Sequence, residues 1–141
     1  MPKYSYVEWL SAEEMHETIK QWVSELNFIK DEQLFLNDLV QSHTHQLIDT
    51  SIFEESKKAI ANLKIAENDL VPLLKMVQIH ENQLGIMMDA IDQFKMEKAY
   101  LETHKELLIA INSYIQKYRE VKEGLFKIVS FAMKKDKRLL S

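Results

Sequence analysis

Apolar side chains recur at alternating spacings of four and three along most of this chain, and no other sequence feature constrains the fold as strongly. The alternation places each run of apolar side chains on one face of an α-helix, as in the seam of a coiled coil. The first seam consists of Met15, Ile19, Trp22, Leu26, Ile29, Gln33, Leu36, Val40, His43 and Leu47. The second consists of Ile60, Leu63, Glu67, Leu70, Leu74, Val77, Glu81, Leu84, Met88 and Ile91. The third consists of Leu101, His104, Leu108, Ile111, Ile115, Tyr118, Lys122, Leu125, Val129 and Ala132, flanked by Leu107, Tyr114, Val121 and Ile128. Three such seams predict an all-α protein.

The sequence also marks where the first two helices begin. Ser11 and Glu14 occupy the two positions of a capping box, in which each side chain bonds the backbone N–H of the other residue. Ser51 and Glu54 repeat this pattern. We therefore expect the first helix to start at Ser11, the chain to turn near residues 48–51, and a second helix to follow.

A change of phase separates the second seam from the third. If the second seam continued past Ile91, it would place Lys95, Lys98 and Glu102 in the core, which predicts a turn between about Asp89 and Glu97. No glycine or proline marks that turn. One uninterrupted helix through both seams is therefore an alternative that the sequence leaves open.

Glycine and proline are scarce, with 2 of each among 141 residues, so the chain has few places at which it turns readily. Pro72 lies inside the second seam, but the apolar spacing keeps its phase there, which favours one helix kinked at Pro72 over two separate helices. Three helices of similar length predict a single domain over residues 1–141, an antiparallel bundle of three long helices that dimerisation would complete to a larger bundle. Residues 1–10 are expected to cap one end of the bundle. The basic tail 134–141 is expected to fray, its cations suiting the helix dipole, or to contact an acidic partner.

Composition excludes several classes of protein. The net charge of -4 and the pI near 5.7 argue against binding of nucleic acid, which requires a surplus of Lys and Arg. The absence of cysteine excludes disulfides and thiolate sites. No window resembles a membrane span or a secretory signal, so we expect a cytoplasmic protein. No motif of a known catalytic site is present, so we expect that the protein is not an enzyme.

Three polar residues interrupt the seams at one predicted height. With turns near residues 50 and 94, Gln33, Glu67 and Lys122 fall at the same level, where the carboxylate would bond both the ammonium and the amide. We expect this polar layer to set the register of the helices, as a buried Asn does in coiled coils. A proton-relay or ligand-binding role is the alternative.

A second group of polar residues suggests a metal site. With the same two turns, four residues lie within about one helical turn in height: Glu13, His16, Glu81 and His104. Two imidazoles with two carboxylates suit Zn, Mn or Fe. Glu13 and His16 also have the Glu-x-x-His spacing of di-iron bundles, but the second such pair of that family is missing. Because His16 lies beside the seam, a surface histidine and no cofactor is the leading expectation, and a metal site is the alternative.

The second helix is apolar on both faces, which predicts a contact surface. Opposite its seam Ile65, Pro72, Ile79 and Ile86 recur seven apart, and a helix that is apolar on both faces is buried on both. The predicted interface comprises Ile65, Pro72, Met76, Ile79 and Ile86, with Phe28 and Phe35 from the first helix. Either a partner covers this surface, most simply a second copy in a two-fold dimer, or the N-terminal segment or a fourth element does.

These patterns support two functional hypotheses. The first is a non-enzymatic helical bundle that acts by protein–protein interaction, as an adaptor, chaperone-like protein or inhibitor, and forms a homodimer. The second is a metal-binding or metal-sensing bundle that uses the His and Glu residues in its core.

Overall fold

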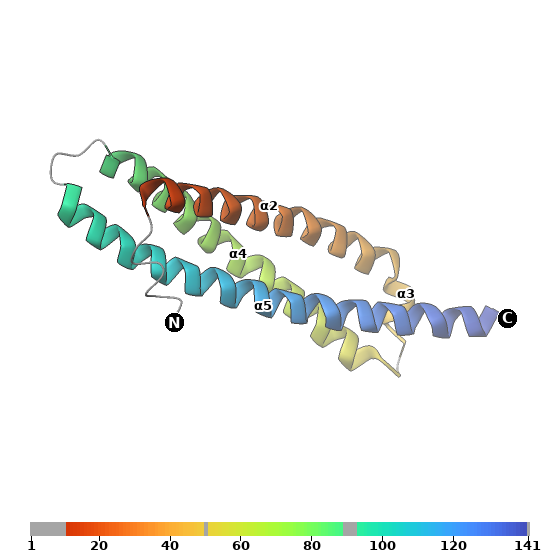
Figure 1. The fold of residues 1–141 in the computed structure, drawn as a ribbon. Coiled ribbons are helices and arrows are strands. Elements are labelled where there is room, and N and C mark those ends of the chain that lie inside the picture. The colour runs from red at the N-terminus through yellow and green to blue at the C-terminus, as the bar shows by residue number, and fades with distance from the viewer. Residues whose placement is uncertain (1–10, 50, 89–92, 141) are drawn as a thin grey trace. The chain divides into compact units, whose positions relative to one another are not determined.

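The computed structural model describes residues 11–49, 51–88 and 93–140, and these are helical almost throughout. The helices are α2 (Ala12–Ser42), α3 (Thr44–Leu47), α4 (Phe53–Met88) and α5 (Gln93–Leu140), as Figure 1 shows. The described part of the chain contains no strand, so the prediction of an all-α protein is confirmed. None of the described helices combines the length and the apolar character that crossing a bilayer demands. The predicted cap at residues 1–10 lies outside the described residues.

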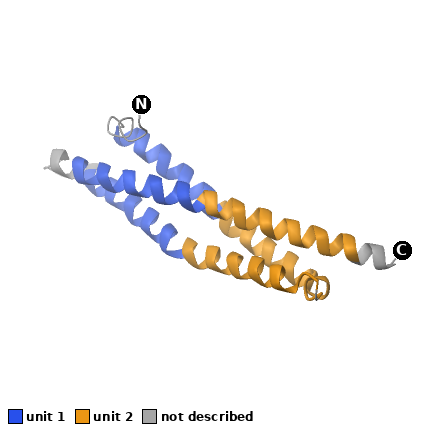
Figure 2. Ribbon diagram, turned by 90° about the horizontal axis from the view of Figure 1, so that it is seen from below, with its two compact units in different colours: residues 1–27, 71–114 blue, residues 28–70, 115–141 orange. Residues whose placement is uncertain are grey.

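The chain divides into two compact units, which Figure 2 distinguishes by colour. Unit 1 consists of residues 1–27 and 71–114, and unit 2 of residues 28–70 and 115–141. Each unit contains one segment of α2, one of α4 and one of α5, so each of the three long helices takes part in both cores.

Helix α2 begins as predicted but ends earlier. The Ser11 hydroxyl accepts from the backbone N–H of Glu14 at 3.1 Å, and the Glu14 carboxylate accepts from the N–H of Ser11 at 3.5 Å, which confirms the first capping box. The predicted helix through Leu47 is interrupted at His43. The His43 ring lies 2.9 Å from the carbonyl oxygen of Leu39, the acceptor that its own N–H would use in an α-helix, and that N–H instead donates to Val40 at 3.2 Å.

The start of α4 corrects the second capping box. The helix begins at Phe53, and the Ser51 hydroxyl does not accept from the N–H of Glu54 but donates to the Asp49 carboxylate at 2.7 Å. The N–H of Ser51 also donates to that carboxylate, at 2.9 Å. Asp49, and not Ser51, is therefore the side chain that organises this turn. The helix continues through Pro72 to Met88, so the two halves of the second seam belong to one helix.

The core of α4 differs in register from the predicted seam. Leu63, Leu70, Val77 and Leu84 are buried as expected, but the alternate positions are shifted by one residue toward the N-terminus. These positions are Ala59, Ala66, Leu73, His80 and Met87. The physical reason is the charge at the predicted positions, because the predicted seam would bury the carboxylates of Glu67 and Glu81, whereas the observed one leaves both half-buried.

Helix α5 packs antiparallel to α4 in unit 1. The rings of His80 and His104 meet at 2.9 Å, whereas 24 positions along one straight helix would be about 36 Å apart. The alternative of one helix through both seams is therefore wrong. The turn predicted between about Asp89 and Glu97 lies partly outside the described residues, because α4 ends at Met88 and α5 begins at Gln93. The deepest residues of α5 are Tyr100, His104, Leu107, Ile111, Tyr114, Tyr118, Leu125, Val129 and Ala132. Leu101, Leu108, Ile115 and Lys122 of the predicted seam are half-buried.

The basic tail was expected to fray, but it is helical. Helix α5 continues to Leu140, and the Lys135 ammonium donates to the Asp49 carboxylate at 2.9 Å and to the Ser51 hydroxyl at 2.7 Å. These bonds tie the end of α5 to the turn before α4 within unit 2. Burial is partial on both sides of this ion pair, so we assign it a modest stabilising role.

Candidate functional site

A pair of buried imidazoles is the most unusual feature of unit 1. His80 of α4 and His104 of α5 are each 1% exposed, and the His80 Nε2 lies 2.9 Å from the His104 Nδ1. A hydrogen bond at this distance requires a hydrogen on one nitrogen and a lone pair on the other, so at least one of the two rings must be neutral. The His80 Nδ1 is also buried and has no hydrogen-bond partner among the described residues.

Two aromatic side chains enclose the histidine pair. The Tyr100 ring stacks on His80 with centroids 4.0 Å apart and planes 5° apart, and its hydroxyl donates to the His80 backbone carbonyl at 2.9 Å. Trp22 of α2 stacks on His104 with centroids 4.7 Å apart. The cluster therefore draws one side chain from α2, one from α4 and two from α5, and it excludes water from both imidazoles.

This enclosure favours the neutral form of every titratable group in the cluster. Burial and, to a smaller extent, the neighbouring His104 together lower the pKa of His80 to about 4. Burial also lowers the pKa of His104 to about 4. Burial and the nearby Glu81 carboxylate raise the pKa of Tyr100. At neutral pH the cluster is therefore uncharged.

The structure does not assemble the predicted metal site. Glu13 and His16 are exposed on α2, Glu81 is half-buried on α4, and His104 is buried against His80. Among the residues that the structure describes, no three His, Cys, Asp or Glu side chains are placed to hold a metal ion. The predicted ligand set is therefore wrong. Residue numbers give the height of these residues along the helices, but not the direction in which each side chain points.

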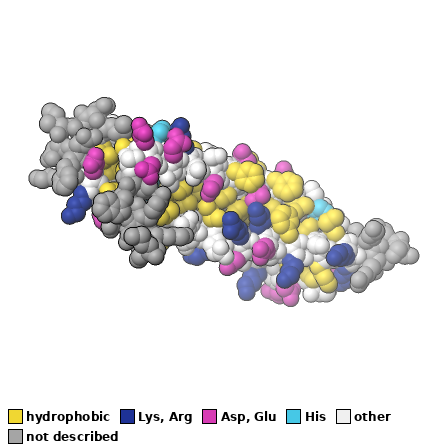
Figure 3. Space-filling view, in the orientation of Figure 1, with side chains coloured by type: hydrophobic (Ala, Val, Ile, Leu, Met, Phe, Trp, Pro, Cys, Tyr) yellow, Lys and Arg dark blue, Asp and Glu magenta, His cyan; other side chains and the backbone are white. Residues whose placement is uncertain are grey.

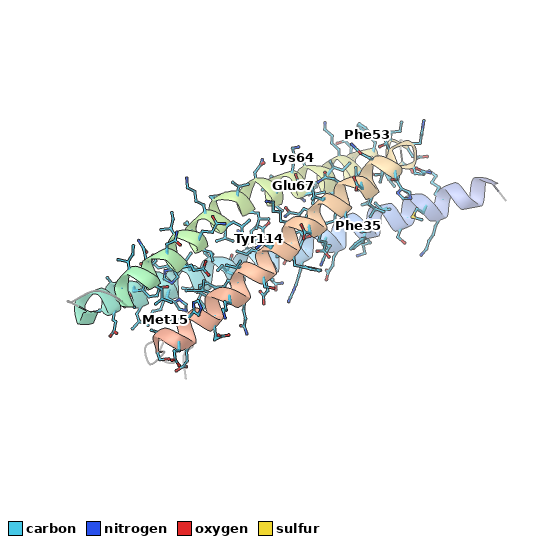
Figure 4. All side chains as sticks on the ribbon, turned by 90° about the horizontal axis from the view of Figure 1, so that it is seen from above. Met15, Phe35, Phe53, Lys64, Glu67 and Tyr114 are labelled. Carbon is cyan, nitrogen blue, oxygen red and sulfur yellow. The ribbon has the colours of Figure 1, made fainter. Side chains whose placement is uncertain are left out.

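The three residues of the predicted polar layer all belong to unit 2, but Glu67 and Lys122 do not bond each other as expected. Gln33 is buried, and the Glu67 carboxylate accepts from the Asn37 amide at 2.5 Å, with Glu67 on the side of α4 that faces α2 in Figure 4. The Lys122 ammonium reaches the Glu32 carboxylate of α2 at 3.0 Å and does not pair with Glu67.

Glu32 is the centre of the second polar group in unit 2. The Tyr118 hydroxyl donates to the same carboxylate oxygen as Lys122, at 2.7 Å. Partial burial opposes ionisation of Glu32, but the bonds from Tyr118 and Lys122 outweigh it and lower the pKa of this carboxyl. These contacts link α2 directly to α5.

The predicted interface residues of α4 are exposed. In unit 1 the side chains of Pro72, Met76, Ile79 and Ile86 all lie on the surface, with Ile79 47% and Ile86 65% exposed. We call these four residues the α4 stripe. The stripe borders an open pocket of about 430 Å³ between α4 and α5, lined by Gln83, Ile86, Met87, Ala99, Tyr100 and Thr103.

The other predicted interface residues belong to unit 2, and they too are exposed. They are Ile65 of α4 and Phe28 and Phe35 of α2, each more than half exposed. Phe28 precedes Glu32 by four residues and Phe35 follows it by three, so both lie on the side of α2 that meets α5. Phe126 of α5, which follows Lys122 by four residues, is also exposed on the edge that meets α2.

Sequence reasoning missed the residues that give these sites their chemistry. His80 and Tyr100 lie one position from the predicted seams. Glu32 and Asn37 of α2 bond side chains of other helices, Tyr118 of α5 and Glu67 of α4 respectively. A signal for His80 was present, because a seam through Ala66, Leu73, His80 and Met87 has the same spacing as the predicted one and carries no carboxylate. Nothing in the sequence marks which lysine Glu32 meets.

Comparison of the chain with models of protein families, with curated proteins and with solved structures finds no match in any of the three.

Proposed function

We propose that this protein is a non-enzymatic antiparallel bundle of three long helices that acts by protein–protein contact and forms a homodimer. One observation carries the proposal: large apolar side chains that a solitary bundle would turn inward are exposed in both units. They are the α4 stripe in unit 1 and Ile65, Phe28 and Phe35 in unit 2. Contiguous exposed apolar surface of this kind is typical of interaction sites.

The α4 stripe supports the proposal because a concave surface adjoins it. Ile86 belongs both to the stripe and to the wall of the pocket between α4 and α5. A partner that covered the stripe would also have room to place a side chain in that pocket, and buried anchors of this kind dominate the binding energy of protein interfaces.

The test is self-association of purified protein, measured by native mass spectrometry and by sedimentation across a range of concentrations. The variants are Phe35→Glu together with Ile79→Glu, which places one carboxylate on each apolar surface. The matched control is Ile109→Glu on α5, because Ile109 is 48% exposed and Ile79 is 47% exposed. We expect the wild type and the control to dimerise and the double variant to be monomeric with unchanged helix content. A wild type that stays monomeric at every concentration, or a double variant that still dimerises, contradicts the proposal.

A further inference from the structure

In unit 2, helices α2 and α5 run side by side in the same direction. Glu32 bonds Tyr118 and Lys122, which lie 86 and 90 positions later, and Lys135 bonds Asp49 with the same separation of 86. Glu32 lies on α2 and Asp49 lies in the turn after α3, so the separation is nearly constant from α2 to that turn. Helices α2 and α5 are therefore parallel, and a residue of α2 lies level with one about 88 positions later. We call the surface formed by Phe28, Phe35 and Phe126 the aromatic face. Figure 3 shows hydrophobic side chains gathered over α2 and α5.

The two sides of the aromatic face carry opposite charge. Residues 28–42 of α2 contain one lysine and three acidic residues. Residues 116–130 of α5, which are level with that segment, contain four lysines or arginines and two acidic residues, although the whole chain is net negative. Asp31 of α2 and Arg119 of α5 are both exposed, and the separation of about 88 positions puts them level with each other.

We propose that a second copy of this chain docks on the aromatic face, with α2 of one copy against α5 of the other and Asp31 beside Arg119 of the second copy. The inference rests on the proposed function and names the surface that self-association uses. Two copies packed face to face have a two-fold axis in the plane of contact, and that axis lies either along the helices or across them. An axis along the helices places α2 of each copy against α5 of the other copy at equal height. Asp31 of each copy then lies beside Arg119 of the other, so the ion pair forms twice. An axis across the helices sets the basic α5 against itself, which is repulsive.

The α4 stripe does not offer the same self-complementarity. Between residues 71 and 88 the only charged side chains are Lys75, which is exposed, and Glu81, which is half-buried. A second copy on this stripe would gain no reciprocal ion pairs to set its orientation. Self-association through the aromatic face therefore leaves the α4 stripe and its pocket open to a different protein.

The size of the aromatic face indicates a weak dimer. The segment 28–42 is about 22 Å long at ~1.5 Å per residue. A contact of that length lies at the low end of specific interfaces, for which we expect a dissociation constant on the order of micromolar. In a dimer this weak, two reciprocal ion pairs are a sizeable part of the binding energy, and their effect grows at low ionic strength.

The decisive experiment uses Asp31→Arg and Arg119→Asp, separately and mixed, with dimer content read by native mass spectrometry and sedimentation at low salt. Each variant alone brings two like charges together twice, so we expect its dimer to be weakened about tenfold relative to the wild type. An equimolar mixture restores both opposite-charge pairs in the heterodimer, so we expect heterodimers to exceed either homodimer. Asp69→Arg and Lys64→Glu on α4 are the matched controls, because both residues are exposed in unit 2 away from this face.

The outcomes separate this inference from the proposed function. If both charge variants dimerise like the controls and the mixture shows no preference for heterodimers, the second copy does not use the aromatic face. Loss of the dimer in Ile79→Glu alone would then assign self-association to the α4 stripe, and the proposed function would stand. A monomeric wild type would overturn both.

Discussion

Acidification from pH 6.5 toward pH 4 should destabilise this protein, because the folded chain holds the histidine pair of unit 1 in its neutral form. His80 and His104 each have a pKa of about 4 in the folded chain, against an ordinary value of 6.5. Above pH 6.5 both states of the chain carry neutral imidazoles, and the full stability is present. As the pH falls from 6.5 toward 4, the unfolded chain binds protons that the folded chain does not, so stability is lost across this window.

The magnitude follows from the size of the pKa difference. At pH 5.0 the unfolded imidazole is almost fully protonated and the folded one is mostly neutral, which costs ~2 kcal/mol per histidine and ~4 kcal/mol for the pair. A domain of this size is typically stable by ~5–15 kcal/mol, so the loss is large enough to measure and small enough to leave the protein folded. The two carboxyl groups with a lowered pKa contribute little at this pH. The pKa of Asp49 is lowered to about 2 by its bonds to Ser51 and Lys135, and that of Glu32 is also lowered, so their contributions are lost only below about pH 4.5.

The assay is urea unfolding followed by circular dichroism at pH 7.5 and pH 5.0. We expect the wild type to lose ~4 kcal/mol between these values, His80→Gln and His104→Gln ~2 kcal/mol each, and the double variant close to none. Glutamine keeps hydrogen-bonding groups but does not titrate, and the comparison uses the pH dependence of each variant and not its absolute stability. His16→Gln and His45→Gln are the matched controls, since both histidines are exposed, and should lose as much as the wild type. A double variant that is as acid-sensitive as the wild type would refute the reasoning.

Two further predictions concern the core of unit 2 and are measured as free energies of unfolding in urea at pH 7.5. Ser56→Ala should leave stability unchanged or raise it by up to ~1 kcal/mol, because the buried Ser56 hydroxyl has no hydrogen-bond partner within the described part of the chain and an apolar methyl group is cheaper to bury. A clear loss of stability would show that the hydroxyl has a partner in solution. Tyr118→Phe should lower the free energy of unfolding by ~1 kcal/mol, because it removes the 2.7 Å bond to Glu32. Glu32→Gln should then lower the free energy of unfolding less in the Tyr118→Phe background than in the wild type. Additive losses would mean that the two side chains do not interact.

The register of α4 shows where reasoning from the sequence reached its limit. Two seams with the same spacing run along this helix, one through Glu67 and Glu81 and one through Ala66 and His80. Periodicity cannot choose between them, because both contain Leu63, Leu70, Val77 and Leu84. The choice depends on the cost of burying each alternate side chain, and a neutral imidazole with a partner costs less than an ionised carboxylate. That partner is His104 of α5, and only the tertiary structure places it beside His80.

The sequence by itself determined the helices, because the spacing of apolar residues and the capping box at Ser11 act over a few neighbouring positions of one chain segment. It also determined the seam of α2, where every predicted position is buried or half-buried. The tertiary structure alone decided which polar side chains meet. A height along a helix can be read from residue numbers, but the direction of a side chain around each helix depends on how the three helix segments pack together within each unit. For that reason His104 meets His80 and not a metal ion, and Lys122 meets Glu32 and not Glu67.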